Sequence, residues 1–460
     1  MLLLGTALAG CTALAPDMPA HAVPVPARWS DQGDAAATYD DAHYWDALGD
    51  PALSALVEQA LAQNLDLAQS ATRLVQAREQ LVQARAGFLP TLNASAGGNQ
   101  GFLDGAGDPN FNLGLDASWE ADLFGRIGNS ARAASFDYEA AGFSLADLRR
   151  SIAGQVATQV ISARAAANQL AMARDTLRIQ EDNLQIARWR NQAGLVSSLD
   201  VEQARTQRAQ TAAAIPQIES NLAATSNAIS TLVGETPGRV RELLARTQPI
   251  PVPPALARLS APADLLRRRP DVRQAEATLA SDTVRIGVAR AQLYPLLRLT
   301  GSIGTNDIGP LNLFDLVTGT VTGAVTQLLF DGGRTQSQIR SARALADGSL
   351  ANWRKSILTA LEEVESAIAA RRAADARLTE YLEAVDAANN AAILARSQYQ
   401  AGLTDFQTLL TSESALLSAR NSVISAEADR AATFVRLTQA LGGGWSGDNP
   451  ATLSDDRTAP

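Results

Sequence analysis

An internal duplication constrains the fold of this chain more than any other feature. Four segments of the first half recur in the same order in the second half, at an offset of roughly 205 residues. Leu-Phe-Gly-Arg at 123–126 matches Leu-Phe-Asp-Gly-Gly-Arg at 329–334, and Gln-Ala-Gly-Leu at 192–195 recurs at 400–403. Solenoid repeats are much shorter. The 460 residues therefore predict two copies of one unit, not the three globular domains that length alone suggests.

Each copy is expected to contain short helices, two strands, a very long helix and a shorter returning helix. The first copy has the predicted ranges 49–234 overall, strands 90–100 and 111–123, long helix 126–191 and return helix 199–233. The second has 263–441 overall, strands 296–304 and 317–329, long helix 334–400 and return helix 406–441. The remaining predicted segments are a signal peptide at 1–11, an extended segment at 12–48, a Pro-rich surface linker at 235–262 and a tail at 442–460.

The long helices carry apolar residues at heptad spacing. In the first copy these are Val156, Ala163, Leu170, Leu177 and Leu184, and the second copy repeats the pattern. Heptad spacing is typical of a coiled-coil seam. A helix of this length would extend about 100 Å at 1.5 Å per residue, which is far more than a compact domain needs.

The predicted strands alternate between apolar and polar residues. From Phe111 to Leu123 the alternation has no fault, and this length suits a tilted strand that crosses a membrane. A sheet half buried on a soluble core would show the same alternation, but helices about 100 Å long leave no obvious core for it to cover. We therefore favour strands that face lipid on one side and water on the other.

Four strands cannot close a barrel, and open sheet edges are not tolerated in hydrocarbon. Two chains would give eight strands and a barrel filled by its own side chains, whereas three would give twelve and room for water. If the strands form a pore, a cyclic homotrimer with four strands from each chain is the smallest useful solution.

The only cysteine, Cys11, ends the segment Leu-Ala-Gly-Cys after an apolar run. This pattern resembles the lipobox at the end of an export signal and predicts a covalent lipid on Cys11 that holds the N-terminus at a bilayer. The alternative is a small buried thiol. No stretch of 18 consecutive apolar residues is present, so a transmembrane helix is not predicted.

Composition excludes several classes of function. The net charge of −9 argues against a nucleic-acid partner. With His21 and His43 as the only histidines and one cysteine, the chain has little material for histidine catalysis, zinc ligation or disulfides. Glu362, Glu363 and Glu365 lack a companion catalytic motif. We therefore predict that the protein is not an enzyme and has no cofactor besides the lipid.

One block resembles a known family. Leu-Leu-Arg-Arg-Arg-Pro-Asp-Val-Arg-Gln-Ala-Glu at 265–276, with Tyr-Pro at 294–295, is similar to the signature of TolC-like outer-membrane factors, in particular the OprM/NodT lipoproteins of tripartite efflux pumps. The resemblance implies a fold that is mainly α with a membrane β-barrel: a homotrimer with a twelve-stranded barrel, four strands from each chain, continued by a long α-helical barrel. This assembly would be an exit duct in the outer membrane of a Gram-negative bacterium with a long periplasmic extension. The resemblance also implies a periplasmic adaptor and an inner-membrane transporter of the resistance-nodulation-division class as partners, with small molecules such as drugs as cargo.

Two alternatives share some of these features. The same duct could serve a type I system that secretes polypeptides, because the upstream components choose the cargo. A lipid-anchored periplasmic coiled-coil adaptor would explain the heptads and Cys11. It would leave the alternating strands unexplained.

The turns between long and returning helices fall where the family has its periplasmic aperture. The resemblance implies adaptor contacts at Gly194, Leu195, Gly402 and Leu403, and gate candidates at Asp200, Asp405, Gln407, Thr411, Glu413 and Tyr399. Thr411 and Gln407 stand where family members carry aspartate and leucine rings. A threefold axis would turn each inward carboxylate into a ring, whereas a helix-start carboxylate would have only a capping role. The basic run Arg267, Arg268 and Arg269 is expected to be a solvated or dipole-paired helix end.

Overall fold

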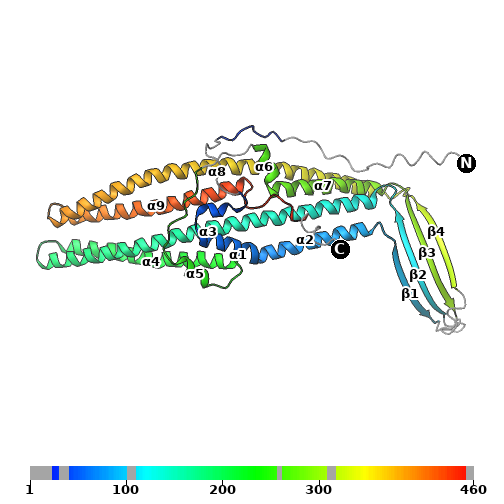
Figure 1. Ribbon diagram of the computed structural model, residues 1–460, viewed down its shortest axis with the longest axis horizontal. Helices are drawn as coiled ribbons and strands as arrows, with labels where there is room; N and C mark the ends of the chain where they lie inside the picture. The colour runs from blue at the N-terminus through cyan, green and yellow to red at the C-terminus, as the bar shows by residue number, and fades with distance from the viewer. Residues whose placement is uncertain (1–22, 31–40, 101–109, 256–261, 308–316, 452–460) are drawn as a thin grey trace.

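A computed structural model describes residues 23–30, 41–100, 110–255, 262–307 and 317–451. The molecule is long and narrow, with the strands at one end and the two helical hairpin tips at the other (Figure 1). The predicted fold class is confirmed in its mainly helical body and its small antiparallel sheet. Cys11 and the rest of the predicted signal peptide lie outside the described residues.

The two copies have the same order of elements. The first contains α1 (Pro51–Gln63), α2 (Leu65–Ala86), β1 (Thr91–Asn99), β2 (Asn110–Ala121), α3 (Arg126–Gln192) and α4 (Ser198–Leu232). The second contains α7 (Pro270–Ala291), β3 (Leu296–Asp307), β4 (Val317–Thr326), α8 (Arg334–Gln400) and α9 (Phe406–Ala440). Both long helices have 67 residues and both returning helices have 35, so the two hairpins are equal in length.

Local sequence explains where the elements begin and end. Asn64 separates α1 from α2 because its side chain accepts hydrogen bonds from the N–H groups of Asp66 and Leu67, which caps the second helix. Gly125 and Gly333 precede the long helices with φ of 72° and 86°, a region that glycine adopts without strain.

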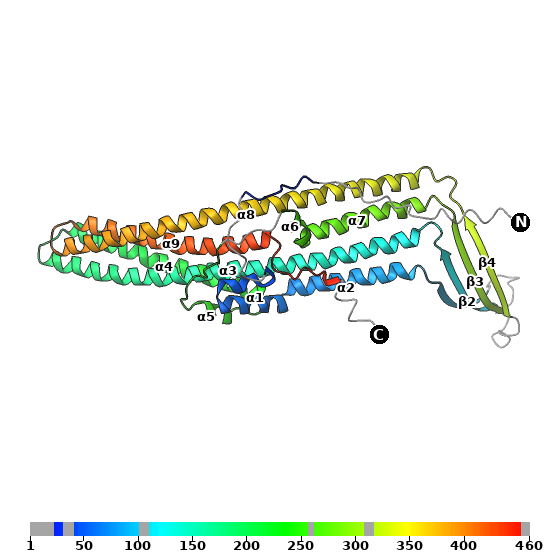
Figure 2. The same cartoon turned by 45° about the horizontal axis from the view of Figure 1, so that its top comes forward.

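No returning helix is long enough to accompany its partner alone. Along α3, α4 covers the tip half and α2 the half nearest the sheet, while α9 and α7 do the same along α8 (Figure 2). The main hydrophobic core lies midway along the molecule, where α1, α3, α4 and the end of α9 meet. This packing lets two short helices together match one long helix.

Three sequence predictions are corrected at this midpoint. The predicted linker contains a helix, α5 (Arg239–Leu244), because Val240 and Leu244 lie one helical turn apart and both are fully buried. The segment before α1 is not extended throughout, since Asp41–Leu48 forms a 3-10 helix that buries Tyr44 and Trp45. The short helix α6 (Pro262–Arg268) precedes α7, where the second copy was expected to begin with short helices.

The third correction concerns the basic run. Arg267 and Arg268 are exposed as predicted, but Arg269 is buried. Its guanidinium binds Asp271 through two hydrogen bonds of 2.9 and 2.6 Å, and it donates to Glu363 on α8 at 2.6 Å. Arg269 therefore ties the start of α7 to α8.

Candidate functional site

The four strands form one antiparallel sheet in the order β1-β2-β3-β4. The central pairing joins the two copies, because β2 belongs to the first and β3 to the second. In this register Leu115 lies opposite both Ala94 and Ile303, and Trp119 lies opposite Leu299. Residues directly opposite each other share a face of the sheet. The two faces can therefore be read from the pairing.

The register gathers the apolar side chains on one face. That face carries Leu92, Ala94, Ala96, Phe111, Leu113, Leu115, Ala117, Trp119, Ala121, Leu297, Leu299, Ile303, Val317, Val321 and Val325. The opposite face carries mainly asparagine, serine, threonine and glycine. The apolar face is not covered by this chain, since Leu92 is 70% exposed and Val321 is 89% exposed. Such a face requires an apolar environment from outside the chain.

The sheet is also open at both sides. Within the described strands, β1 pairs only with β2 and β4 pairs only with β3. Their outer edges therefore present unpaired N–H and C=O groups. A sheet with an uncovered apolar face and two open edges can be completed by further strands from outside the described residues.

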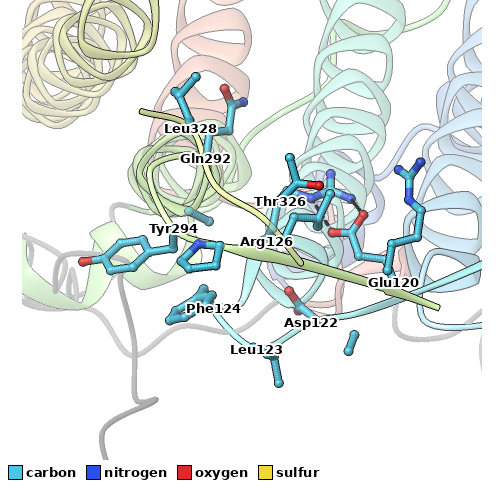
Figure 3. Close-up of a pocket in the computed structure, with 14 residues that line it drawn as sticks. Glu120, Asp122, Leu123, Phe124, Arg126, Gln292, Tyr294, Thr326 and Leu328 are labelled. Atoms are coloured by element: carbon cyan, nitrogen blue, oxygen red, sulfur yellow. Dashed lines mark hydrogen bonds and ion pairs between the residues drawn. The ribbon is translucent and has the colours of Figure 1, made fainter. Parts of the chain in front are cut away.

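The junction between sheet and helices holds the strands at a fixed position (Figure 3). Arg126 at the start of α3 binds Glu120 with two hydrogen bonds of 2.8 Å, and Asp122 accepts from the N–H groups of Ile127 and Gly128. The rings of Phe124 and Tyr294 stack with centroids 4.9 Å apart. The side chains of Glu120, Asp122, Phe124, Arg126 and Tyr294 line a cavity of about 440 Å³. Both hairpins of the sheet are thus attached to the helical body at one place.

At the first hairpin tip, the chain turns through Gly194, whose φ is 73°. Leu195 is 69% exposed. Asp200 lies at the third position of α4, where it forms a reciprocal capping box with Ser197. The structure thus places Asp200 in the capping role that the sequence left open.

The second tip repeats this geometry with different side chains. Gly402 has a φ of 75°, and Leu403 is 79% exposed. Asp405 caps α9, and its hydrogen bonds from Thr408 hold the pKa of Asp405 below its usual value. Gln407 and Thr411 lie one turn apart on the exposed side of α9, where the Thr411 hydroxyl donates to the Gln407 carbonyl.

Glu413 and Tyr399 do not lie at free surfaces. Glu413 accepts hydrogen bonds from Asn183 of α3 at 2.7 Å and Arg396 of α8 at 2.8 Å. Arg190 of α3 donates to the Tyr399 carbonyl at 3.1 Å and lies 4.6 Å from the centre of its ring. Both residues therefore connect the first hairpin to the second.

Sequence reasoning missed the partners in these connections: Asn183, Arg190 and Arg396. No local pattern marks them, because each meets a residue on another helix of the bundle. An apolar cluster supports the same connection, with Leu184, Ala204, Tyr399 and Leu409 drawn from four helices.

Two features are absent from the described residues. No helix among them combines the length and apolar character needed to cross a membrane. In the same residues, no group of three or more His, Cys, Asp or Glu side chains could hold a metal ion.

The fold and the open, one-sided sheet define a subunit of a membrane channel wall, and comparison with known proteins places the chain in a family. The model of the family described as "Outer membrane efflux protein" matches residues 56–235 and 261–443. The chain therefore belongs to the outer membrane efflux protein family, and the predicted resemblance is confirmed. The two matched segments correspond to the two copies of the repeat, one segment to each copy.

Individual relatives agree over nearly the whole chain. Nodulation protein T of Rhizobium leguminosarum bv. trifolii is 29% identical over 448 residues, which cover 95% of this chain and 96% of the relative. The toluene efflux pump outer membrane protein TtgI of Pseudomonas putida is 31% identical over 460 residues, with 95% and 96% covered. The solved structure of the outer-membrane channel OprN is 30% identical, with a TM-score of 0.85 and coverage of 93% and 99%. These similarities confirm the predicted location in the outer membrane and the predicted role in efflux.

Proposed function

We propose that three copies of this chain form the exit duct of a tripartite efflux system. One observation carries this proposal: a four-stranded sheet whose apolar face is uncovered and whose two edges are open. Three sheets joined edge to edge would give a twelve-stranded barrel with its apolar face toward lipid and its polar face around water. The long helices would continue this wall into the periplasm as a tunnel.

The partners and the cargo follow from the same proposal. A periplasmic adaptor would bind the hairpin tips, where Leu195 and Leu403 are exposed apolar side chains. An inner-membrane transporter, in our proposal of the resistance-nodulation-division class, would load the duct. Small molecules are the proposed cargo, a choice supported by the relative that is named for toluene efflux.

The gate candidates would have different roles in the proposed duct. Asp200 and Asp405 would fix the starts of the returning helices at the aperture. Glu413 and Tyr399 would hold the two hairpins together and keep the aperture narrow. Gln407 and Thr411 line a groove with Leu199 and Gln203 of α4, which gives an adaptor helix a surface shared by both hairpins.

A lipid on Cys11 would add a second attachment to the membrane. The proposal rests on the Leu-Ala-Gly-Cys segment of the sequence. Mass spectrometry of the purified protein should find acyl chains on the N-terminal peptide, and the Cys11→Ala variant should lack them. An unmodified Cys11 in material purified from the membrane would contradict the lipid anchor.

A matched pair of variants tests which face of the sheet meets lipid. Val321 lies on the apolar face and Thr322, its neighbour in β4, on the polar face. Val321→Arg should reduce the yield of membrane-inserted trimer, because an arginine at the middle of a lipid-facing strand costs about 2–4 kcal/mol. Thr322→Arg should insert normally and lower the single-channel conductance. Equal insertion of both variants would contradict the proposed orientation.

A further inference from the structure

The polar face of the sheet carries very few charges. In the described strands, the ionisable side chains on this face are Asp116, Glu120 and Arg298. The register identifies this face, because all three lie opposite polar or small residues on the neighbouring strands. Each charge on this otherwise neutral wall should therefore have a measurable effect on ions passing it.

Glu120 and Arg298, two of these three side chains, belong to a group of four charges whose sum is zero. Glu120 is directly opposite Arg298 and forms an ion pair with Arg126 at the start of α3. Asp122 is the fourth charged group here, and it holds the first N–H groups of α3. Two carboxylates and two guanidinium groups sum to zero at the helix end of the sheet, as Figure 3 shows for the labelled members Glu120, Asp122 and Arg126.

Asp116 differs from these groups in both position and partners. It lies four residues before Glu120, which is about 13 Å along the strand. Its neighbours across the sheet are Asn93 and Ser302, which are neutral. Asp116 is exposed, and among the described residues it has no ion-pair partner. It is the one charge on the described polar face that no nearby charge offsets.

The carboxylates at the hairpin tips are engaged in local interactions. Asp200 and Asp405 cap helices, and Glu413 is paired with Arg396. Their charges are partly offset by helix dipoles or by a cation. Charge selection at the tips is therefore weaker than the number of their carboxylates suggests.

We propose that Asp116 is a specificity-determining residue that gives the barrel its preference for cations. This inference rests on the proposed trimeric duct, in which the threefold axis turns Asp116 into a ring of three carboxylates facing water. Such a ring attracts cations and repels anions. Cationic cargo and small cations would pass this level of the lumen more readily than anions of similar size.

Ionic strength limits the reach of such a ring. The Debye length is about 10 Å at 0.1 M salt and about 3 Å at 1 M. In a wide, water-filled barrel the cation preference should therefore be clear at 0.1 M and nearly absent at 1 M.

The experiment measures the ratio of potassium to chloride permeability from reversal potentials in planar bilayers under a KCl gradient. The unmodified protein should prefer potassium, and Asp116→Asn should lower the ratio about threefold or to near unity, since the ring of charge is lost. The double variant D116N/S302D should restore the preference, because Ser302 is the cross-strand neighbour on the same face. Asn93→Ser, a neutral change beside Asp116, is the matched control and should leave the ratio unchanged.

The outcomes separate this inference from the proposed function. Channels of normal conductance whose permeability ratio is unaffected by Asp116→Asn would overturn the role of Asp116 and leave the duct intact. Absence of any conductance from the unmodified trimer would overturn the duct itself and the inference with it.

Discussion

The two long hairpins have equal lengths but unequal burial. α3 has 24 buried residues and α8 has 14, although each helix contains 67 residues. α3 packs against α1, α2 and α4 of its own copy and also against α7 and α9 of the other. α8 packs mainly against α7 and α9. Duplication therefore fixed the lengths of the hairpins, while their surroundings made α3 the central helix of the chain and α8 a peripheral one.

The ion pairs that hold the two long helices also differ in burial: the pair of α3 is buried, whereas the pair of α8 is partly exposed. Arg164 of α3 binds Asp50 at 2.9 Å with both side chains sealed from water, at 0% and 7% exposure. Arg269 binds Glu363 of α8 at 2.6 Å, but the Glu363 side chain is 45% exposed. We infer that the α8–α9 hairpin is held less firmly and is the easier of the two to displace.

Breaking the buried pair of Arg164 and Asp50 should cause the largest loss of stability. Arg164→Met leaves Asp50 buried without its cation and should cost about 3–5 kcal/mol in the free energy of unfolding. Denaturant titration followed by circular dichroism measures this loss. Arg174→Met on the same helix removes an exposed pair with Glu219 and should cost less than about 1 kcal/mol. Similar losses in the two variants would contradict the assignment of α3 as the firmly held helix.

Breaking the pair in the second copy should have a smaller effect. Arg269→Met removes hydrogen bonds to Asp271 and Glu363, but both carboxylates keep some contact with water. The expected loss is about 1–3 kcal/mol, measured in the same titration. A larger loss than that of Arg164→Met would reverse the proposed ranking of the two hairpins.

Acidic pH should remove part of the stabilisation that the pair of Arg269 and Asp271 provides. Burial alone would raise the pKa of Asp271, but hydrogen bonding to Arg269 and its charge hold that pKa below the ordinary value. The stabilisation is therefore complete above the unfolded pKa of about 3.9 and is lost as the pH falls through the lower folded pKa. The stability difference between the unmodified protein and Asp271→Asn should be smaller at pH 3 than at pH 7. An equal difference at both values would show that ionised Asp271 is not the stabilising form.

Breaking the contacts that Glu413 makes between the two hairpins should have a modest effect, measured as a rise in single-channel conductance. Glu413→Lys places a second cation beside Arg396 and removes the acceptor for Asn183. A contact worth up to about 1 kcal/mol shifts the population of separated tips by up to about fivefold. Single-channel conductance should rise more for Glu413→Lys than for Asp200→Lys, which alters only a helix start. Unchanged conductance and ion selectivity in both variants would remove both residues from the gate.

The smallest effect on global stability should come from the glycines at the two hairpin tips, and it should be the same in both copies. Gly194→Ala and Gly402→Ala each place a side chain at a φ near 75°, with open space around the added carbon atom. Each should cost about 1–2 kcal/mol locally, with little loss of global stability, because only a tip is strained. Protease cleavage at the tips should increase equally in both variants. A clear difference would show that the two turns are not equivalent.

Sequence alone predicted the features that depend on local periodicity. The alternation from Phe111 to Leu123 located β2, and the heptads indicated the two long helices, whose predicted ranges 126–191 and 334–400 agree with α3 and α8 to within one residue. The repeated Gln-Ala-Gly segments located both tips, because a glycine with positive φ ends each long helix there. These patterns need no knowledge of which helix packs on which.

Contacts between distant segments could not be predicted in this way. The pair of Arg164 and Asp50 joins residues 114 positions apart, and nothing in either local sequence marks the other. Arg269 was expected to be solvated or dipole-paired because it belongs to a basic run at a helix end, yet it is buried and binds Glu363 of α8. α5 was missed because the prolines at 249–254 dominated the interpretation of that segment.

Counting the chains in the native complex tests the proposed trimer. Native mass spectrometry of the detergent-solubilised protein, combined with planar-bilayer recording of the same sample, measures both the stoichiometry and the pore. We expect complexes of three chains that conduct ions, because three four-stranded sheets close a water-filled barrel. A single chain in detergent that leaves bilayers impermeable would rule out the proposed trimeric duct.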